Sequence, residues 1–505
     1  MPKLNCLTCS LSVAAMLVGA PAIADITAAE LWAEWQANGI TIGQPVSAAA
    51  VETTPNGLVL RGYASTTNEG NAVTSGSLDE VRLIEMGDGT VSIELSDVYT
   101  LVATFPEDAD APNGNLITVE LEVRYDGLDV RASGSVGALV YDYSADTITM
   151  TDGTIADTDG VEPDIAIAVV ATGLSASYAQ SGLGDAATFA SSSNMNSLAI
   201  DINAAPPPEE SPNGQFKFSM LMSDIASTGR GSFDGLSALA QISTAGLPDS
   251  FDLGGDTSYG ELTYDLSFED GSDAFRAAGG NAGGAMAFSI SQDGVGYDLS
   301  ANSPRVQVAG SDIPFPIDVS AESAGISFLI PLLAADTPSD MAIGIDYRNL
   351  TVNDAIWSMF DPGAIIPRDP ATLVLNVTGT VQIFMDLIGL DPEELTGPPG
   401  ELRSVNIEDA QLSVAGAALT ADGDFTFTPN QVMPMPIGML NLNLSGANAL
   451  LDRLVQGGVL RPEQAAMARG MSGMFTRPGP SPDTLETTID FLPGGGITAN
   501  GIPLQ

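Results

Sequence analysis

Few residues in this chain could carry out catalysis. Histidine is absent, and the two cysteines, Cys6 and Cys9, both fall within the first 24 residues. Zinc, haem and copper sites built from imidazole or thiolate need these side chains, as do Ser-His-Asp and Cys-His nucleophiles. Lys217 is the one lysine beyond residue 24, and no Ser-x-x-Lys spacing leads to it. Carboxylate pairs or a bound Ca²⁺ or Mg²⁺ remain, and no pair stands out among 64 acidic residues.

Two patterns are compatible with metal binding. Met433, Met435 and Met439 offer thioether sulfurs that suit Cu(I), although methionine also fills irregular apolar gaps. Acidic clusters at residues 108–115 and 157–164 approach a calcium-binding loop, and the first misses its register by one residue. Since neither pattern completes a ligand set, we predict no metal site, no catalytic residue and no cofactor.

The first 24 residues have the features of a secretory signal peptide. Lys3 supplies the positive start, residues 11–20 form a short apolar core, and Ala22-Ile23-Ala24 is a small-x-small cleavage site. We expect a mature protein that begins at Asp25, lacks disulfides and resides in the periplasm of a Gram-negative bacterium. No apolar run elsewhere is long enough for a transmembrane helix.

The composition is strongly acidic, with 64 acidic against 16 basic residues. Such a charge repels nucleic acids and anionic lipid surfaces and favours solubility. We therefore predict no nucleic-acid partner. The acids are dispersed along the chain, which is typical of a solvated surface.

The longest regular pattern is the alternation of apolar and polar residues over 372–387. Leu373, Leu375 and Val377 are the first apolar residues of one face, and polar residues occupy the other face. Alternation at period two predicts a strand with one buried and one wet face. Gly379 marks the expected bend or bulge. A strand of this length needs a broad sheet beside it.

Turn signals elsewhere predict many further strands. Pro55-Asn56-Gly57, Gly87-Asp88-Gly89 and Asp152-Gly153 are hairpin signals between alternating runs. Thr27-Ala28-Ala29-Glu30 is a capping box that begins a short N-terminal helix, and residues 353–360 predict a second short helix. The fold class is therefore mainly β, with large curved antiparallel sheets.

A helical hairpin is predicted over residues 447–475, packed on one of the sheets. Gly457-Gly458 ends its first helix, and Pro462 begins the second. Apolar side chains line both helices, and we take them as one wall of a sheet–helix groove for an apolar or lipid-like ligand. The candidate ligand residues are Leu450, Leu454, Met467, Met471 and Met474.

Several segments of the chain resemble a known family. They are NDAIWSMFDPGAIIPRDPATLVLNVTG at 353–379, PPGELRSVNIEDAQLSVAGAALTADGDFTF at 398–427 and GANALLDRLVQGGVLRPEQAAMARGMSGMFTRPG at 446–479, together with ITAAELWAEWQ after the signal. These resemble domain of unknown function 2125, a family of secreted alphaproteobacterial proteins. The resemblance implies an envelope location and no established activity. Its repeated hairpins are also similar to AsmA-like envelope proteins, whose long grooves are associated with lipids.

The domain organisation follows from one break in composition. We predict a signal peptide at 1–24, an N-terminal β region at 25–203, a Pro-rich linker or loop at 204–214 and a C-terminal β region at 215–505. The leading hypothesis is a non-enzymatic periplasmic protein that binds an apolar or lipid-like ligand. A purely structural or protein-interaction envelope protein is the alternative, and a carboxylate-based hydrolase is a third class.

Overall fold

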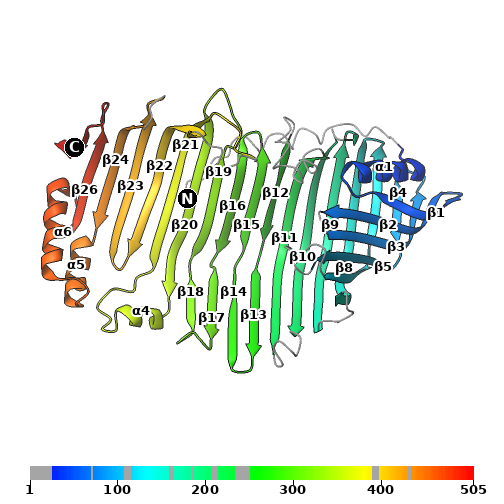
Figure 1. Cartoon of the computed structure of the whole chain (residues 1–505), viewed down its shortest axis with the longest axis horizontal. Helices are drawn as coiled ribbons and strands as arrows, with labels where there is room; N and C mark the ends of the chain where they lie inside the picture. The colour runs from blue at the N-terminus through cyan, green and yellow to red at the C-terminus, as the bar shows by residue number, and fades with distance from the viewer. Residues whose placement is uncertain are drawn as a thin grey trace.

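We describe a computed structural model of the chain (Figure 1). It describes residues 25–69, 72–106, 115–157, 164–184, 187–205, 214–233, 251–388, 397–429 and 434–504. The predicted signal peptide and most of the predicted linker, residues 206–213, lie outside these ranges. The four helices used below are α1 (Ala28–Thr41), α4 (Asp354–Phe360), α5 (Ala447–Gln456) and α6 (Pro462–Phe475).

The described residues form 28 strands that belong to one antiparallel sheet. The first eleven are β1 (Val46–Thr54), β2 (Gly57–Glu69), β3 (Ala72–Glu85), β4 (Val91–Leu95), β5 (Val98–Pro106), β6 (Leu116–Asp126), β7 (Asp129–Ser135), β8 (Ala138–Asp157), β9 (Asp164–Ser181), β10 (Thr188–Ala205) and β11 (Gln215–Ser232). The next nine are β12 (Asp252–Tyr259), β13 (Leu262–Asp270), β14 (Asp273–Asn281), β15 (Gly284–Ser291), β16 (Gly294–Asn302), β17 (Arg305–Gly310), β18 (Ile317–Ser320), β19 (Ser323–Ile330) and β20 (Ser339–Val352). The last eight are β21 (Ala371–Ile383), β22 (Gly400–Val414), β23 (Ala417–Phe427), β24 (Pro436–Ser445), β25 (Arg477–Pro478), β26 (Thr484–Phe491), β27 (Ile497–Ala499) and β28 (Ile502–Pro503).

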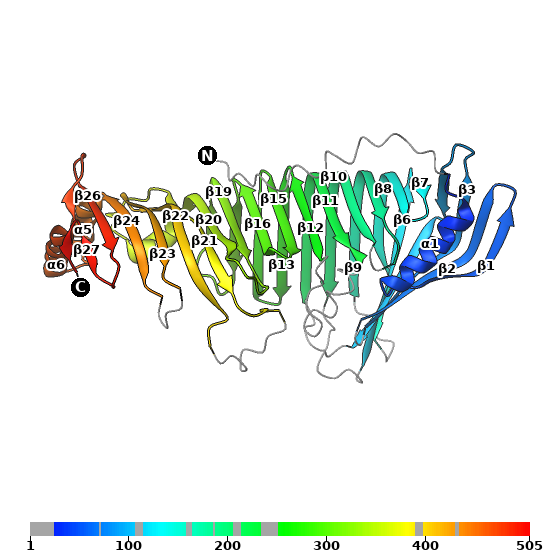
Figure 2. The same cartoon turned by 90° about the horizontal axis from the view of Figure 1, so that it is seen from above.

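The sheet runs the length of the molecule as a row of mostly sequential antiparallel neighbours (Figures 1 and 2). It divides twice. Between β3 and β8, the pairs β4–β7 and β5–β6 lie one beyond the other along the strand direction. Between β11 and β20, β12–β15–β16–β19 form the upper half in Figure 1, and β13–β14–β17–β18 form the lower half. β10 and β11, on either side of the predicted linker, pair with each other, so both β regions share one sheet.

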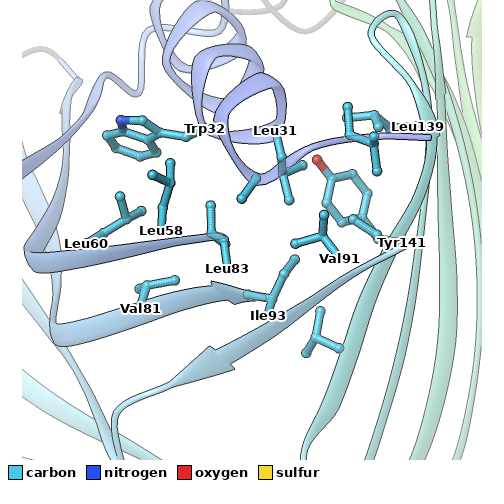
Figure 3. Packing of buried hydrophobic residues seen from close by; sticks show 14 of the residues in the cluster. Leu31, Trp32, Leu58, Leu60, Val81, Leu83, Val91, Ile93, Leu139 and Tyr141 are labelled. Atoms are coloured by element: carbon cyan, nitrogen blue, oxygen red, sulfur yellow. The ribbon is translucent and has the colours of Figure 1, made fainter. Parts of the chain in front are cut away.

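The predicted N-terminal helix is confirmed as α1, and it covers one end of the sheet. Thr27 accepts the Glu30 N–H and Glu30 accepts the Thr27 N–H, which completes the expected capping box. Leu31 and Trp32 point down onto Leu58, Leu60 and Leu83 (Figure 3). This cluster holds most of the buried hydrophobic side chains among the described residues.

One face of the sheet is apolar along the whole length of its long strands. Within several strands, the residues that point to this face switch from odd-numbered to even-numbered positions or the reverse. Tyr178 and Val169, on β9, are an odd number of residues apart, which in a regular strand would place them on opposite faces. Both nevertheless face the α1 side. Tyr178 packs on the α1 cluster, and Val169 shares a lateral row with Tyr99, which packs there too. Gly173, between them, has a φ of +62°, and this left-handed residue resets the alternation.

Among the described residues, Gly173 is one of four that have positive φ in the interior of a strand longer than ten residues. The others are Gly62 in β2, Asp224 in β11 and Asn349 in β20. Glycine adopts this conformation without a steric penalty, and Asp and Asn tolerate it better than other residues. At these residues the alternation is reset, so the apolar side chains stay on one side of the sheet.

Glu34 is a buried carboxylate in α1. Its oxygens accept hydrogen bonds from Gln180 Nε2 at 3.1 Å and from the Gly137 N–H at 3.2 Å. Burial raises the pKa of Glu34 above its ordinary value of 4.5, while the Gly137 hydrogen bond acts in the opposite direction. At pH values between the pKa of Glu34 in the unfolded state and its higher pKa in the folded state, the folded protein binds more protons. Raising the pH through this range therefore lowers the free energy of unfolding.

Replacing Glu34 by glutamine should remove this cost. Glu34→Gln should gain free energy of unfolding relative to the unchanged protein as pH rises from about 4.5, the ordinary value, to 7. Urea unfolding of both proteins at a series of pH values measures this difference. A difference that stays constant with pH would show that folding does not shift the pKa of Glu34.

The long strand that was predicted over 372–387 is shorter than expected, and its buried residues are not confined to the expected face: Ile383 lies on that face, and Thr372, Val374 and Gln382 lie on the other. β21 ends at Ile383, after which Phe384 and Leu387 donate backbone hydrogen bonds to Pro399 and Leu332. The apolar alternation is present, but Leu373 is 43% exposed whereas Val374, on the opposite face, is 1% exposed. The prediction assumed that a second layer covers every apolar face, and no described element covers this one.

Two glycine predictions are wrong. Gly379 pairs in register with Met341 and Val405, and the two register shifts of β21 against β22 leave their extra residues, Arg403 and Glu408, on β22. The bulges therefore lie in the partner strand, and a Cβ at Gly379 would overlap the Ser404 carbonyl. Asp152-Gly153, predicted to be a hairpin turn, instead lies inside β8. There the β6 pairing shifts register, so the two residues form a bulge in a continuing strand.

Candidate functional site

The candidate site is the uncovered apolar face of the sheet, hereafter the open face, from β12 to β26. Residues that pair directly in antiparallel strands lie side by side on one face. The pairings give a row across nine strands with one gap, at Gly423 in β23. The row comprises Phe288, Tyr297, Phe328, Ile343, Val377, Ile407, Leu440 and Ile489.

Two further rows follow the first, both on the same side of it, at successive positions along the strands. One contains Met286, Leu299, Ile326, Ile345, Leu375, Ala410, Ala421 and Leu442. The other contains Ala301, Ala324, Tyr347, Leu373, Leu412, Leu419, Leu444 and Leu485. Consecutive members come from neighbouring strands, so the three rows form one apolar surface rather than scattered side chains.

A lateral row in the other half of the sheet extends the apolar surface toward α1. It contains Tyr63, Leu78, Tyr99, Val123, Met150, Val169, Ile200, Met220 and Tyr264. Its first members pack beneath α1, where Tyr63 is half-buried and desolvation raises its pKa to about 12.

None of the side chains in the three rows of the open face is buried. Met286, Leu299 and Ile326 are adjacent in one row, and each is about two-fifths exposed. Contiguous apolar surface of this extent is rare on monomeric soluble proteins, and it commonly marks a ligand, membrane or partner site. The α1 cluster differs because a helix covers it.

The opposite face is polar and carries the ion pairs of these strands. Arg305 contacts Asp318 at 2.7 Å, and Arg348 contacts Asp346 at 2.8 Å. Asp318 accepts hydrogen bonds from Arg305 and Gln307, and these hold the pKa of its carboxyl below the ordinary range. Acids are thus directed away from the open face, which presents almost no charge to a ligand.

None of the predicted ligand residues of the helical hairpin is fully buried. The hairpin itself is confirmed as α5 and α6, which lie at the C-terminal end of the sheet, where α5 contacts β23 (Figure 1). Leu450 and Leu454 are half-buried in α5. Met467, Met471 and Met474 are more than half exposed on α6 and so line no enclosed groove.

Among the described residues, the structure adds little support for the metal-binding patterns. No group of three or more Asp or Glu suited to a metal ion occurs among the described residues. In the predicted copper pattern, Met435 and Met439 are exposed, and Met433 lies outside the described ranges. Residues 108–114 and 158–163 of the acidic clusters also lie outside these ranges. An open hollow of about 310 Å³ is lined mainly by polar side chains such as Asp422 and Asn441.

The open face could have been recognised from two signals in the sequence. Phe288-Ser289-Ile290, Ile326-Ser327-Phe328 and Ile343-Gly344-Ile345 each show period-two alternation and each read as a strand fragment. Their lateral alignment depends on register, which no single fragment reveals. The stronger signal is the small number of predicted helices, too few to cover so many one-sided strands.

No helix among the residues described is long and apolar enough to cross a bilayer. No curated protein and no solved structure matches the chain. Residues 260–504 match the model of a family described as "Uncharacterized protein conserved in bacteria (DUF2125)", and this C-terminal half, which carries most of the open face, resembles that family.

Proposed function

We propose that the protein is a non-enzymatic envelope protein that holds the acyl chains of lipids on the open face. The observation that carries this proposal is the set of three apolar rows that cross neighbouring strands from β15 to β24 and remain uncovered. A flat apolar surface suits flexible hydrocarbon chains, which need no enclosed pocket.

The energetics favour a long ligand over a small one. Each CH₂ group removed from water contributes roughly 0.8 kcal/mol, and a chain lying on an open surface is covered on one side only. A small apolar molecule would therefore gain little, whereas a chain spanning several strands accumulates contacts. The absence of charged side chains from the rows allows this contact without burying an unpaired charge.

The periplasm is the proposed location because lipids pass through it and the first 24 residues have the features of a secretory signal. The described residues supply no histidine or cysteine for catalysis, so binding is a better account of the face than turnover. The other candidate for the face is a protein partner, including a second copy of this chain.

Neighbouring residues on β16 provide a matched test. Leu299 lies on the open face and Ser300 on the opposite face, and both are exposed. Two variants would each carry a photocrosslinking phenylalanine analogue, one at Leu299 and one at Ser300. After irradiation with a fluorescent phosphatidylcholine, the Leu299 variant should become labelled and the Ser300 variant should not.

Equal labelling at the two positions would contradict lipid binding on this face. Irradiation without lipid tests the protein-partner candidate. A protein-to-protein crosslink from position 299, together with a dimer in sedimentation velocity, would favour a face-to-face assembly of two copies. Mass spectrometry of the protein purified from its native envelope would identify the lipid class.

A further inference from the structure

The two ends of the sheet differ in how their outermost strands are protected (Figures 1 and 2). At the C-terminal end the last strands among the described residues, β25, β27 and β28, are two or three residues long, and Pro478 and Pro503 end two of them. Short strands and proline are devices by which proteins keep a sheet edge from pairing with another chain. The N-terminal end lacks both devices.

The outermost strand at the N-terminal end is β1, which is nine residues long and, among the described residues, pairs only with β2. It contains no proline and no lysine, and a single register runs through the β1–β2 pair, so no bulge turns the edge away. Seven of its nine residues are exposed. The outer side of β1 therefore presents an unguarded row of backbone N–H and C=O groups.

The pairing with β2 shows which backbone groups point outward. Thr54 and Gly57 pair across the two-residue turn Pro55-Asn56, so they exchange backbone hydrogen bonds. In an antiparallel pair every second residue bonds to the partner strand, and the residues between them direct their N–H and C=O groups to the other side. Val51, three residues before Thr54, therefore offers both groups to the free edge.

The charge on β1 itself does not oppose a second strand. Glu52 is its only charged residue, and the Arg61 guanidinium on β2 lies 2.9 Å from the Glu52 carboxylate. The net charge of −48 on the whole chain repels a second copy over longer distances. Salt screens this repulsion, so any association through β1 should strengthen as ionic strength rises.

A free edge accepts an extended strand, and symmetry favours the same strand of a second copy. Two β1 strands that pair antiparallel about a two-fold axis satisfy both free edges at once, and the assembly is closed. Pairing of β1 with the C-terminal end of another copy would instead build an open filament. The short strands and prolines at that end prevent it.

We propose that β1 pairs antiparallel with β1 of a second copy, so that the two sheets join into one. The two-fold axis is normal to the sheet, which keeps the α1 side of both copies on the same side. The two open faces then lie toward opposite ends of one continuous sheet. This inference rests on the edge strand alone and holds whether or not the open face binds lipid.

Single cysteines map the pairing, because the chain has no cysteine after residue 24. Each residue of β1 in turn is replaced by cysteine in the protein that begins at Asp25, and diamide oxidises the purified variants. The distance between a residue and its copy in the partner strand grows by roughly 7 Å for each residue away from the axis. A disulfide needs Cα atoms within about 7 Å, so the crosslinked dimer should peak at one or two neighbouring positions.

The opposite end of the sheet supplies the matched control. Ile502, in β28, is 50% exposed, as accessible as the middle of β1. Ile502→Cys should give only the background of random collisions, because this end does not pair.

A proline in β1 tests the backbone bonds directly. Val51 is 48% exposed, and Val51→Pro removes an outward N–H but no bond to β2. Sedimentation velocity should show a dimer of the unchanged protein and a dissociation constant at least about tenfold higher for Val51→Pro. Val51→Thr keeps the N–H and should stay within about twofold of the unchanged protein. Thermal melts verify that both variants fold, and the cysteine scan decides alone if Val51→Pro does not.

Three results would overturn edge pairing: a monomer at every protein and salt concentration, crosslinking that is uniform along β1 or equally strong at Ile502, or an undiminished dimer of folded Val51→Pro. A face-to-face dimer would crosslink from Leu299 and not from β1. Failure of the edge and failure of the open face are therefore separate outcomes.

Discussion

Leu60→Ala is expected to lower the free energy of unfolding by about 2–5 kcal/mol, the range for emptying a packed leucine site. Leu60 is fully buried beneath α1, among Leu31, Trp32 and Leu83 (Figure 3). Truncation there removes contacts on all sides and leaves a cavity that the helix and strands can only partly close. Urea unfolding followed by tryptophan fluorescence reports on this end directly, because Trp32 and Trp35 belong to or adjoin the cluster.

The matched control is Leu299→Ala on the open face. Leu299 is 38% exposed and has no layer above it, so truncation removes less apolar contact and creates no enclosed cavity. We expect a cost below about 1 kcal/mol, under the packed-core range. Equal costs at the two positions would mean that something covers the open face in solution, and that the contrast between the two ends is wrong.

Gly57→Ala is the second substitution with a large expected effect. Gly57 follows the Pro55-Asn56 turn and begins β2 with a φ of +144°, a region that residues with a Cβ rarely adopt. A Cβ at this position would also overlap the carbonyl oxygen of Leu83 in the neighbouring β3. Backbone strain of about 1–3 kcal/mol and a displaced strand pair together predict a loss of roughly 3 kcal/mol or more.

The variant Gly271→Ala separates the effect of backbone strain from the effect of the overlap with the neighbouring strand. Gly271, in the turn between β13 and β14, also has positive φ, at +59°, but no heavy atom lies within 4 Å of its added Cβ. Only the backbone penalty of roughly 1–2 kcal/mol should therefore be seen there. Comparing the thermal melts of the two variants checks this. A Gly57 variant no worse than the Gly271 variant would show that β3 moves aside at little cost.

Local features of the fold were predictable because they depend on residues close together in the sequence. The capping box at Thr27 and Glu30, the turn at Pro55-Asn56-Gly57 and the helical hairpin over 447–475 all match the structure. Each is specified within a few residues by capping or turn chemistry. The prediction of large antiparallel sheets holds for the same reason, since alternation and turn spacing are local properties.

The burial pattern was less predictable because covering a face depends on distant parts of the chain. The alternation in 372–387 distinguishes an apolar face from a polar face. It does not show which of the two faces is covered by another layer, and Leu373, on the apolar face, is exposed. Asp152-Gly153 resembles a turn unless the continuing pairing of β8 is known. The methionines of α6 have the spacing of a packed stripe, and only the position of α6 at the end of the sheet leaves them open.

The single-layer construction of the sheet also has a consequence for folding cooperativity. Beyond α1, most strands contact only their two lateral neighbours, so stability there is approximately a sum of nearest-neighbour terms, as in repeat proteins. Such a chain need not unfold in one step. The end beneath α1, which has a second layer, forms the most cooperative unit. The strands from β12 onward lose their neighbours progressively, and a ligand spread across several of them would couple strands that the backbone ladder alone leaves nearly independent.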